Sequence, residues 1–341
     1  MSVDPIVPEL RDDVGVDGFC GGDIAVGNGY DALAVMPDER AFVARGSIAR
    51  VAGTYPIAGM QAHHRMDGYD FVREVSLRQP QTPPSNENTT LYPDWNAQNL
   101  GGENAADHAW GMVIDLELCI GCNACISVCN VENNVLVVGK DQVARGREML
   151  WLRVDHYYTG DVEDPRSFFQ PVPCMHCEKA PCEMGCPVHA TVHSPEGLNQ
   201  MVYNRCIGTR TCSSYCPYKV RRFNWYDYRR FAEAERAGKN PEVTVRSRGV
   251  MEKCTYCVQR IENAHAEADK EGRALRRDEV ITACQQACPT KAITFGDLKD
   301  ADSGASKRRR SGRHYALLEE LGTRPRTTYL ARWKDQDEGG A

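Results

Sequence analysis

Short apolar runs separated by polar and glycine-rich segments predict a chain built from short strands and helices. Three of these runs predict buried strands, at 112–115, 150–154 and 292–295. A longer stretch from Val258 to about Gly272 places Ile261, Ala264 and Ala268 at helical spacing, which predicts a helix with one apolar face. Further short helices are expected to run on from the cysteine-rich segments. The pattern therefore favours an α+β fold.

The expected organisation follows from where this pattern changes. Short β-like runs at 41–44 and 48–51 give the N-terminal segment a partly β-rich character. A proline- and asparagine-rich stretch after it predicts a linker or a strap across a partner. The expected divisions are an N-terminal segment at 1–75, a linker at 76–108, a main domain at 109–333 and a tail at 334–341.

Composition excludes several classes of protein. The chain has 341 residues, of which 42% are hydrophobic and 26% charged, as in globular domains rather than disordered chains. No stretch approaches the roughly 18 consecutive apolar residues of a transmembrane helix. The first part of the chain also lacks the apolar run of a signal peptide. The net charge of -6 argues against nucleic acid as the main partner.

Cysteine is the residue type that sets the expected chemistry. Of the 16 cysteines, Cys20 lies far upstream, and the others fall in four tight groups between Cys119 and Cys288. Disulfide frameworks normally stabilise small secreted domains, and pairs this close in sequence would close strained loops. We therefore expect the groups to bind metal.

The spacing within the groups favours iron–sulfur clusters. The first group, from Cys119 to Cys129, has the spacing C-x2-C-x2-C-x3-C of bacterial ferredoxins. The second, 174–186, has a longer central loop, and the fourth, 254–288, has the predicted helix inserted before its last two cysteines. Zinc is the competing interpretation of any single C-x2-C pair. A zinc ribbon has no need, however, of the C-x3-C-P ending that recurs in this chain.

The third group lacks one ligand. It contains Cys206, Cys212 and Cys216, with Thr209 where the spacing predicts a cysteine. Three thiolates predict a [3Fe-4S] cluster, because one iron corner of a cubane would have no soft ligand. The alternatives are a [4Fe-4S] cluster ligated by Thr209 and one that recruits Cys20.

Ligand sets follow if each group gives its last cysteine to a partner cluster, as in ferredoxins with two clusters. We name the four expected sets sites I to IV. Site I is Cys119, Cys122, Cys125 and Cys288; site II is Cys129, Cys254, Cys257 and Cys284; site III is Cys174, Cys177, Cys182 and Cys216; and site IV is Cys186, Cys206 and Cys212, with Thr209 at the vacant position. Three [4Fe-4S] clusters and one [3Fe-4S] cluster are expected, with about 15 iron atoms. The implied fold is two ferredoxin-like dicluster modules, one nested in the other, after a partial β-rich N-terminal segment.

Several charged residues near the cysteines have two possible roles. His176 is expected to donate a hydrogen bond to a cluster sulfur rather than to bind iron, and His63 and His64 are expected to be packing or surface residues. The basic residues Lys219, Arg221 and Arg222 offset the charge of the clusters, dock on a membrane subunit or form solvated salt bridges. The basic run 307–310 is expected in a Ser/Gly-rich loop that is solvated, with contact to anionic lipid headgroups as the alternative.

The motifs beside the cysteines resemble a known family. The stretches that carry the resemblance are Cys119–Cys125, Glu132–Asn134, Gly139–Val143, Pro173–Cys177, Met201–Cys206, Pro217–Asn224, Tyr315–Glu320 and Thr323–Leu330. They resemble the four-cluster iron–sulfur subunit of complex molybdopterin-type oxidoreductases, such as polysulfide, dimethyl sulfoxide and nitrate reductases. Within that group the chain is most similar to the iron–sulfur module of alternative complex III, a bacterial quinol-oxidising complex.

The resemblance implies a role and a set of partners. The chain would relay electrons, with no catalytic site of its own, and its [3Fe-4S] site would face an NrfD-like multi-helix membrane quinone subunit. Multihaem cytochrome c subunits would lie nearby, on the periplasmic face of the membrane. The N-terminal stretches Val26–Tyr30 and His63–Gly68 resemble the end of a molybdopterin-oxidoreductase-like module. We therefore expect the rest of that module to be a separate polypeptide, whose fold this N-terminal tail completes.

Three functions remain open at this point. The first is electron transfer in alternative complex III, and the second is electron transfer in a polysulfide- or tetrathionate-reductase-like molybdoenzyme. The third is a zinc-bound scaffold without a redox role. Iron content separates the first two from the third.

Overall fold

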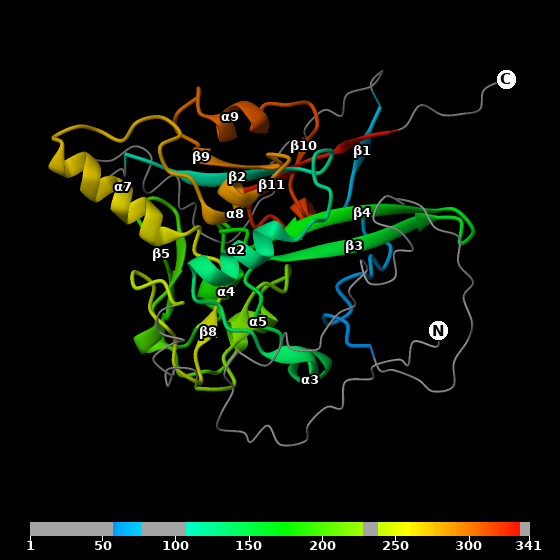
Figure 1. Ribbon diagram of the computed structural model, residues 1–341, viewed down its shortest axis with the longest axis horizontal. Coiled ribbons are helices and arrows are strands. Elements are labelled where there is room, and N and C mark those ends of the chain that lie inside the picture. The colour runs from blue at the N-terminus through cyan, green and yellow to red at the C-terminus, as the bar shows by residue number, and fades with distance from the viewer. Residues whose placement is uncertain (1–56, 77–106, 228–237, 335–341) are drawn as a thin grey trace, which may run out of the picture.

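Short strands and helices alternate with long turns in the computed structural model, which describes residues 57–76, 107–227 and 238–334 (Figure 1). The strands are β1 (Glu74–Val75), β2 (Trp110–Asp115), β3 (Arg153–Gly160), β4 (Pro165–Val172), β5 (Thr191–His193), β6 (Asn199–Met201), β7 (Arg222–Phe223), β8 (Met251–Glu252), β9 (Ile293–Asp297), β10 (His314–Tyr315), β11 (Thr327–Leu330) and β12 (Arg332–Trp333). The helices are α2 (Ala124–Glu132), α3 (Gly139–Ala144), α4 (Pro181–Met184), α5 (Thr211–Ser214), α7 (Val258–Lys270), α8 (Ala283–Ala287) and α9 (Gly304–Arg309), with 3-10 turns η2 (Tyr203–Arg205) and η3 (Glu319–Leu321). This mixture agrees with the expected α+β class.

The largest sheet has the strand order β10-β11-β2-β9. Strand β2 pairs antiparallel with β9 and parallel with β11, so the beginning and the end of the main domain meet in one sheet. All of β2 is buried. Because side chains alternate across a strand, Met112 and Ile114 point into the main core while Val113 packs with Ala305 of α9 on the other face.

Three two-stranded antiparallel sheets lie in the segments between the cysteine groups. The long β3–β4 hairpin pairs Arg153 with Val172 at one end and Gly160 with Pro165 at the other. β5 pairs with β6, and β7 pairs with β8, in both cases antiparallel. Helices α2 and α8 pack together, as do α4 and α5. Each pair joins helices that contain cysteines of different groups, so cysteines distant in sequence are brought side by side.

Helix α7 confirms the helix predicted from periodicity, with Ile261 and Ala268 buried on its inner face. It projects at one side of the molecule in Figure 1. No helix among the described residues is long and apolar enough to cross a membrane.

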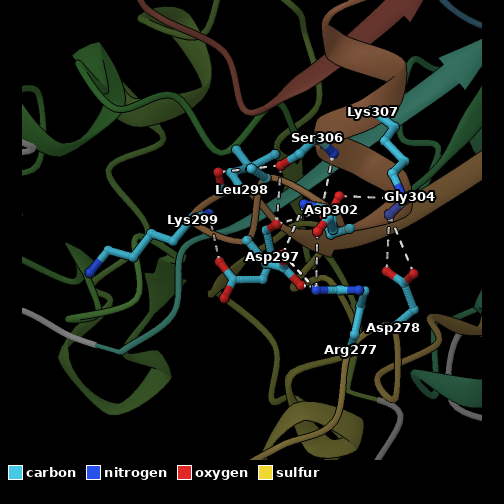
Figure 2. Close-up of polar contacts among 12 residues, drawn as sticks. Arg277, Asp278, Asp297, Leu298, Lys299, Asp302, Gly304, Ser306 and Lys307 are labelled. Carbon is cyan, nitrogen blue, oxygen red and sulfur yellow. Dashed lines mark hydrogen bonds and ion pairs between the residues drawn. The ribbon is translucent and has the colours of Figure 1, made fainter.

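Helix α9 corrects the expectation that the basic run 307–310 lies in a loop, because residues 304–309 are helical. Its N-terminus is capped by Ser303, whose hydroxyl accepts from the Ser306 N–H at 3.1 Å. The Asp278 carboxylate also accepts from the Gly304 N–H, as Figure 2 shows. Basic residues then fall in the last turn, where the helix dipole favours positive charge.

Residues 57–76 pack against the main domain. β1 pairs in parallel with β12, and the Tyr315 hydroxyl donates to the Phe71 carbonyl oxygen at 3.0 Å. This part of the N-terminal segment is therefore attached to the cluster domain of its own chain. The other N-terminal features, including Cys20 and most of the expected linker, lie outside the described residues, and the division into four segments stays a prediction.

Candidate metal centres

The first and third cysteine groups fold into loops of the same shape. Gly121 and Gly208 have φ values of 66° and 75°, and Asn123 and Arg210 have φ values of 61° and 62°. Asn123 and Arg210 then precede α2 and α5 as their N-caps. Two left-handed residues in such a short stretch curl the backbone, so the cysteines on either side turn toward one point.

Three cysteines followed by proline, Cys186, Cys216 and Cys288, form a second kind of loop. In each loop the third residue after the cysteine has a positive φ, between 48° and 55°. In two of them the N–H four residues after the cysteine donates to its sulfur, at 3.2 Å for Cys186 and 3.3 Å for Cys288. Burial alone would raise the pKa of Cys186 and Cys288, but hydrogen bonds from the backbone of the turn, and at Cys288 first from the Thr290 side chain, hold the pKa of both below the usual range. The turns after Cys186 and Cys288 therefore favour the thiolate, whereas burial outweighs the same kind of turn at Cys216 and raises its pKa.

The cysteines expected in each site lie close enough to change one another's pKa. The pKa of Cys125 is raised to about 12, first by burial and then by the other three thiols of site I. Burial and the other thiols of their own sites likewise raise the pKa of Cys129 in site II and of Cys177 in site III. In site IV, burial and the other two thiols raise the pKa of Cys212, and Arg221 opposes them. Thiols this crowded and buried stay protonated unless a cation lies among them, and the iron of a cluster would supply that cation.

The sites follow one another in a line. Cys284 of site II lies near Cys125 of site I, and Cys254 of site II lies near Cys174 of site III. Arg221 contacts both Cys182 of site III and Cys212 of site IV. The order is therefore I, II, III, IV.

The surroundings of site III fit a cluster. A small cavity is lined by its four thiols together with Asn199 and Arg221. Among the described residues, no three His, Cys, Asp or Glu side chains converge tightly enough to surround a single metal ion. The ligands of a cluster stand farther apart than those of one ion, because the iron and sulfide atoms of the cluster lie between them.

Known proteins with similar sequences carry iron–sulfur clusters. Two sequence-family profiles, each described as a 4Fe-4S dicluster domain, match residues 118–190 and 165–232. The menaquinone reductase iron–sulfur cluster-binding subunit of Nitratidesulfovibrio vulgaris is 41% identical over 228 residues, which is 65% of this chain and 89% of that protein. The Hdr-like menaquinol oxidoreductase iron–sulfur subunit 1 of Archaeoglobus fulgidus is 34% identical, over 64% of this chain and 82% of that protein. A subunit of the sulfite dehydrogenase of Allochromatium vinosum is 31% identical, over 65% and 83%.

This chain belongs to the family of electron-transfer iron–sulfur subunits of oxidoreductase complexes. The expectation of ferredoxin-like 4Fe-4S dicluster domains is confirmed. The nesting of the two modules and the number and type of clusters stay predictions.

In this iron–sulfur subunit, Cys129 is the last cysteine of its group and, unlike Cys186, Cys216 and Cys288, is not followed by proline. The side chain of Asn133 donates a hydrogen bond to its sulfur instead. Helix α2 continues past Cys129, so the Asn133 N–H donates to the Cys129 carbonyl oxygen and not to the sulfur. The Asn133 side chain instead reaches the Cys129 sulfur at 3.5 Å and the Cys257 sulfur at 3.8 Å. Sequence reasoning missed this residue, although the absence of proline after Cys129 was visible in the sequence.

His176 has a different partner from the one expected. Its ring accepts from the Asn199 N–H through Nδ1, which leaves the proton on Nε2 to be donated to the Cys254 carbonyl oxygen at 3.1 Å. The backbone N–H of His176, and not its ring, donates to the Cys174 sulfur, at 3.4 Å. The His176 ring also stacks on Tyr256, which lies in the site II loop between Cys254 and Cys257. The imidazole therefore connects the site III loop to the site II loop.

The other basic and histidine residues divide between packing and surface positions. His63 is buried on the Glu148 carboxylate at 2.9 Å, and His64 is exposed, as expected. Arg222 is buried and pairs with the same carboxylate at 2.7 Å, so it is not a solvated salt bridge. Thr209 is exposed, like Cys122 at the matching position of the first loop.

Proposed function

We propose that this chain relays electrons in a membrane-associated, quinol-oxidising complex of the alternative complex III type. The observation that carries the proposal is the grouping of the cysteines into four neighbouring sets along a line. Three sets have the four thiols that a [4Fe-4S] cluster needs, and site IV has the three that suit a [3Fe-4S] cluster. When bound, these clusters supply reversible one-electron transfer. The chain contributes their ligands, their order and their electrostatic surroundings.

The quinone link rests on the named relatives. One relative is named as a menaquinone reductase subunit and another as a menaquinol oxidoreductase subunit. We propose that electrons from quinol enter at site IV and leave at site I for cytochrome c subunits. Electron flow in the opposite direction would use the same sites.

The surface around site IV supports contact with a membrane partner. Met184, Ile207 and Tyr215 follow or adjoin cysteines of this end and are exposed. Exposed apolar side chains beside a cluster site are typical of surfaces that another protein covers. The proposed partner is the multi-helix membrane quinone subunit, with the complex on the periplasmic face. A molybdopterin-oxidoreductase-like polypeptide is proposed as a further partner near the N-terminal segment.

Electron paramagnetic resonance on the oxidised, anaerobically purified subunit tests the cluster assignment. The wild type should show an isotropic [3Fe-4S] signal and contain about 15 iron atoms. Thr209→Cys should lose this signal and gain iron, because the fourth thiolate completes a cubane. Thr209→Ser is the matched control, since it keeps a hydroxyl, and it should keep the signal. Persistence of the signal in Thr209→Cys, or stoichiometric zinc in the wild type, would overturn the assignment.

A second candidate function is electron transfer in a polysulfide- or tetrathionate-reductase-like molybdoenzyme. The similarity of this chain to a sulfite dehydrogenase subunit supports this second candidate. Purification of the intact complex through this chain separates the two. Covalent haem and no molybdenum supports the first, whereas a stoichiometric molybdenum subunit without multihaem cytochromes supports the second.

A further inference from the structure

Arg221 lies between the two inner cysteine sites and is almost entirely buried, with 4% of its surface exposed. One terminal nitrogen, Nη2, donates to the Cys182 sulfur at 3.0 Å and to the Asn199 side-chain oxygen at 2.9 Å. The other, Nη1, donates to the Thr191 hydroxyl at 3.1 Å and to the Met201 sulfur at 3.0 Å. The guanidinium is therefore fixed in one orientation by four side chains.

The same guanidinium also lies close to the Cys212 sulfur, so it faces one cysteine of site III and one of site IV. Burial would lower the pKa of Arg221, but the thiols of Cys182, Cys212, Cys174 and Cys216 outweigh it and raise the pKa. Arginine keeps its proton in proteins under all ordinary conditions. A permanent positive charge therefore lies at the junction of the two sites.

Other buried arginines of this chain pair with a carboxylate, whereas Arg221 pairs with none among the described residues. Arg222 pairs with Glu148 at 2.7 Å, and Arg246 pairs with Glu252 at 2.8 Å. Within the described part of the chain, the hydrogen-bond partners of Arg221 are sulfur atoms, a hydroxyl and an amide, and none of them is a carboxylate. A buried charge without compensation is strongly unfavourable. Anionic, thiolate-ligated clusters at sites III and IV would provide that compensation.

We propose that the positive charge of Arg221 raises the reduction potentials of both inner clusters, at sites III and IV. The inference rests on the proposed ligand sets of sites III and IV. Adding an electron makes a cluster more negative, so a fixed cation at its sulfurs favours the reduced form. Because one guanidinium contacts both sites, it moves both potentials in the same direction. Electron exchange between sites III and IV therefore stays balanced while both accept electrons more readily.

Redox titration of the purified holo-complex, followed by electron paramagnetic resonance, tests the proposal. Arg221→Gln should shift the ratio of reduced to oxidised inner clusters at least tenfold toward oxidised, which is about 59 mV for a one-electron couple. Sites I and II should not move. Arg221→Lys keeps the charge and should restore most of the shift. The double variant Arg222→Gln/Glu148→Gln removes a neighbouring buried arginine with its carboxylate, and it should shift the inner potentials far less, because the Glu148 carboxylate already offsets the Arg222 charge near Cys216.

A second pair of variants tests the charge without removing Arg221, in case its loss prevents assembly. Thr191→Asp places a carboxylate against Nη1 and should lower both inner potentials, because it neutralises the guanidinium. Thr191→Asn has nearly the same shape without charge and should not.

Unchanged potentials in Arg221→Gln or Thr191→Asp, with clusters intact, would overturn the proposal. A shift of equal size in Thr191→Asn would also overturn it. Failure of the proposed ligand sets is distinguishable, since the wild type itself would then lack the inner cluster signals, and failure of the proposed complex type would show as molybdenum without covalent haem in the purified complex.

Discussion

Replacing Gly208 by alanine is expected to disrupt the loop that carries site IV. Gly208 has a φ of +75°, a conformation that residues with a side chain rarely adopt. A Cβ atom there would lie 2.5 Å from the Gly249 carbonyl oxygen and 3.2 Å from the Phe223 ring. The carbonyl belongs to a turn held by the hydrogen bond from the Gly249 N–H to the Asn224 oxygen at 2.8 Å, so it cannot move aside easily.

The magnitude has a conformational and a steric part. Holding alanine at positive φ costs about 1 kcal/mol, and forcing a methyl group against a fixed backbone atom costs about 1–3 kcal/mol. The loop should therefore lose about 2–4 kcal/mol, or about 30- to 700-fold in the ratio of closed to open loop. Sites I and II lie at the other end of the line and should be less affected.

Gly272→Ala is the matched control. Gly272 has a φ of +63° and no atom within 4 Å of the added Cβ, so only the conformational cost applies there. The assay is anaerobic loss of the [3Fe-4S] signal in guanidinium, together with iron content before denaturation. Gly208→Ala should lose the signal much faster than Gly272→Ala. Equal rates with full iron content in both would refute the steric reasoning.

Two further predictions concern buried polar groups. Glu148→Gln leaves Arg222 buried without a carboxylate and should cost about 3–5 kcal/mol, seen as a lower thermal midpoint. Burial would raise the pKa of Glu148, but the His63 hydrogen bond and the Arg222 charge hold it below 4.5, so its stabilisation is complete above that pH and is lost as the pH falls through the folded pKa. The difference between wild type and variant should therefore shrink in acid, and a constant difference would contradict the assignment. Asn133→Leu removes the amide from the site II sulfurs and should lower the site II potential alone; an unchanged potential would make Asn133 purely structural.

The sequence predicted best where one pattern dominates. Helix α7 matches its periodicity, and two of the three apolar runs became strands β2 and β9. The third run, 150–154, is strand only from Arg153 onward. Trp151 lies before the strand, buried under Arg246 with its indole N–H donated to Glu252 at 3.1 Å. An apolar run reports burial, and burial does not by itself distinguish a strand from a packed turn.

The roles of the charged residues could not be predicted in the same way. Whether Arg221 or Arg222 faces a sulfur, a carboxylate or water depends on which segment packs above it, and those segments are distant in sequence. Glu148 lies far from Arg222 along the chain, and Asn199 meets Arg221 only because β5 and β6 bring it to site III. Cysteine spacing identified the loops because its information is local, whereas electrostatic partners are set by the tertiary fold.

Local geometry also bears on the missing ligand of site IV. The loop around Thr209 keeps the two left-handed residues of the loop around Cys122, with φ values of 75° and 62° against 66° and 61°. The two loops therefore turn in the same way, although one has cysteine and the other threonine at the central position. A cysteine at position 209 would emerge from that path as Cys122 does, near the thiols of site IV. Gain of a fourth iron in Thr209→Cys consequently requires no rearrangement of the loop, which makes that variant a direct test of what the threonine changes.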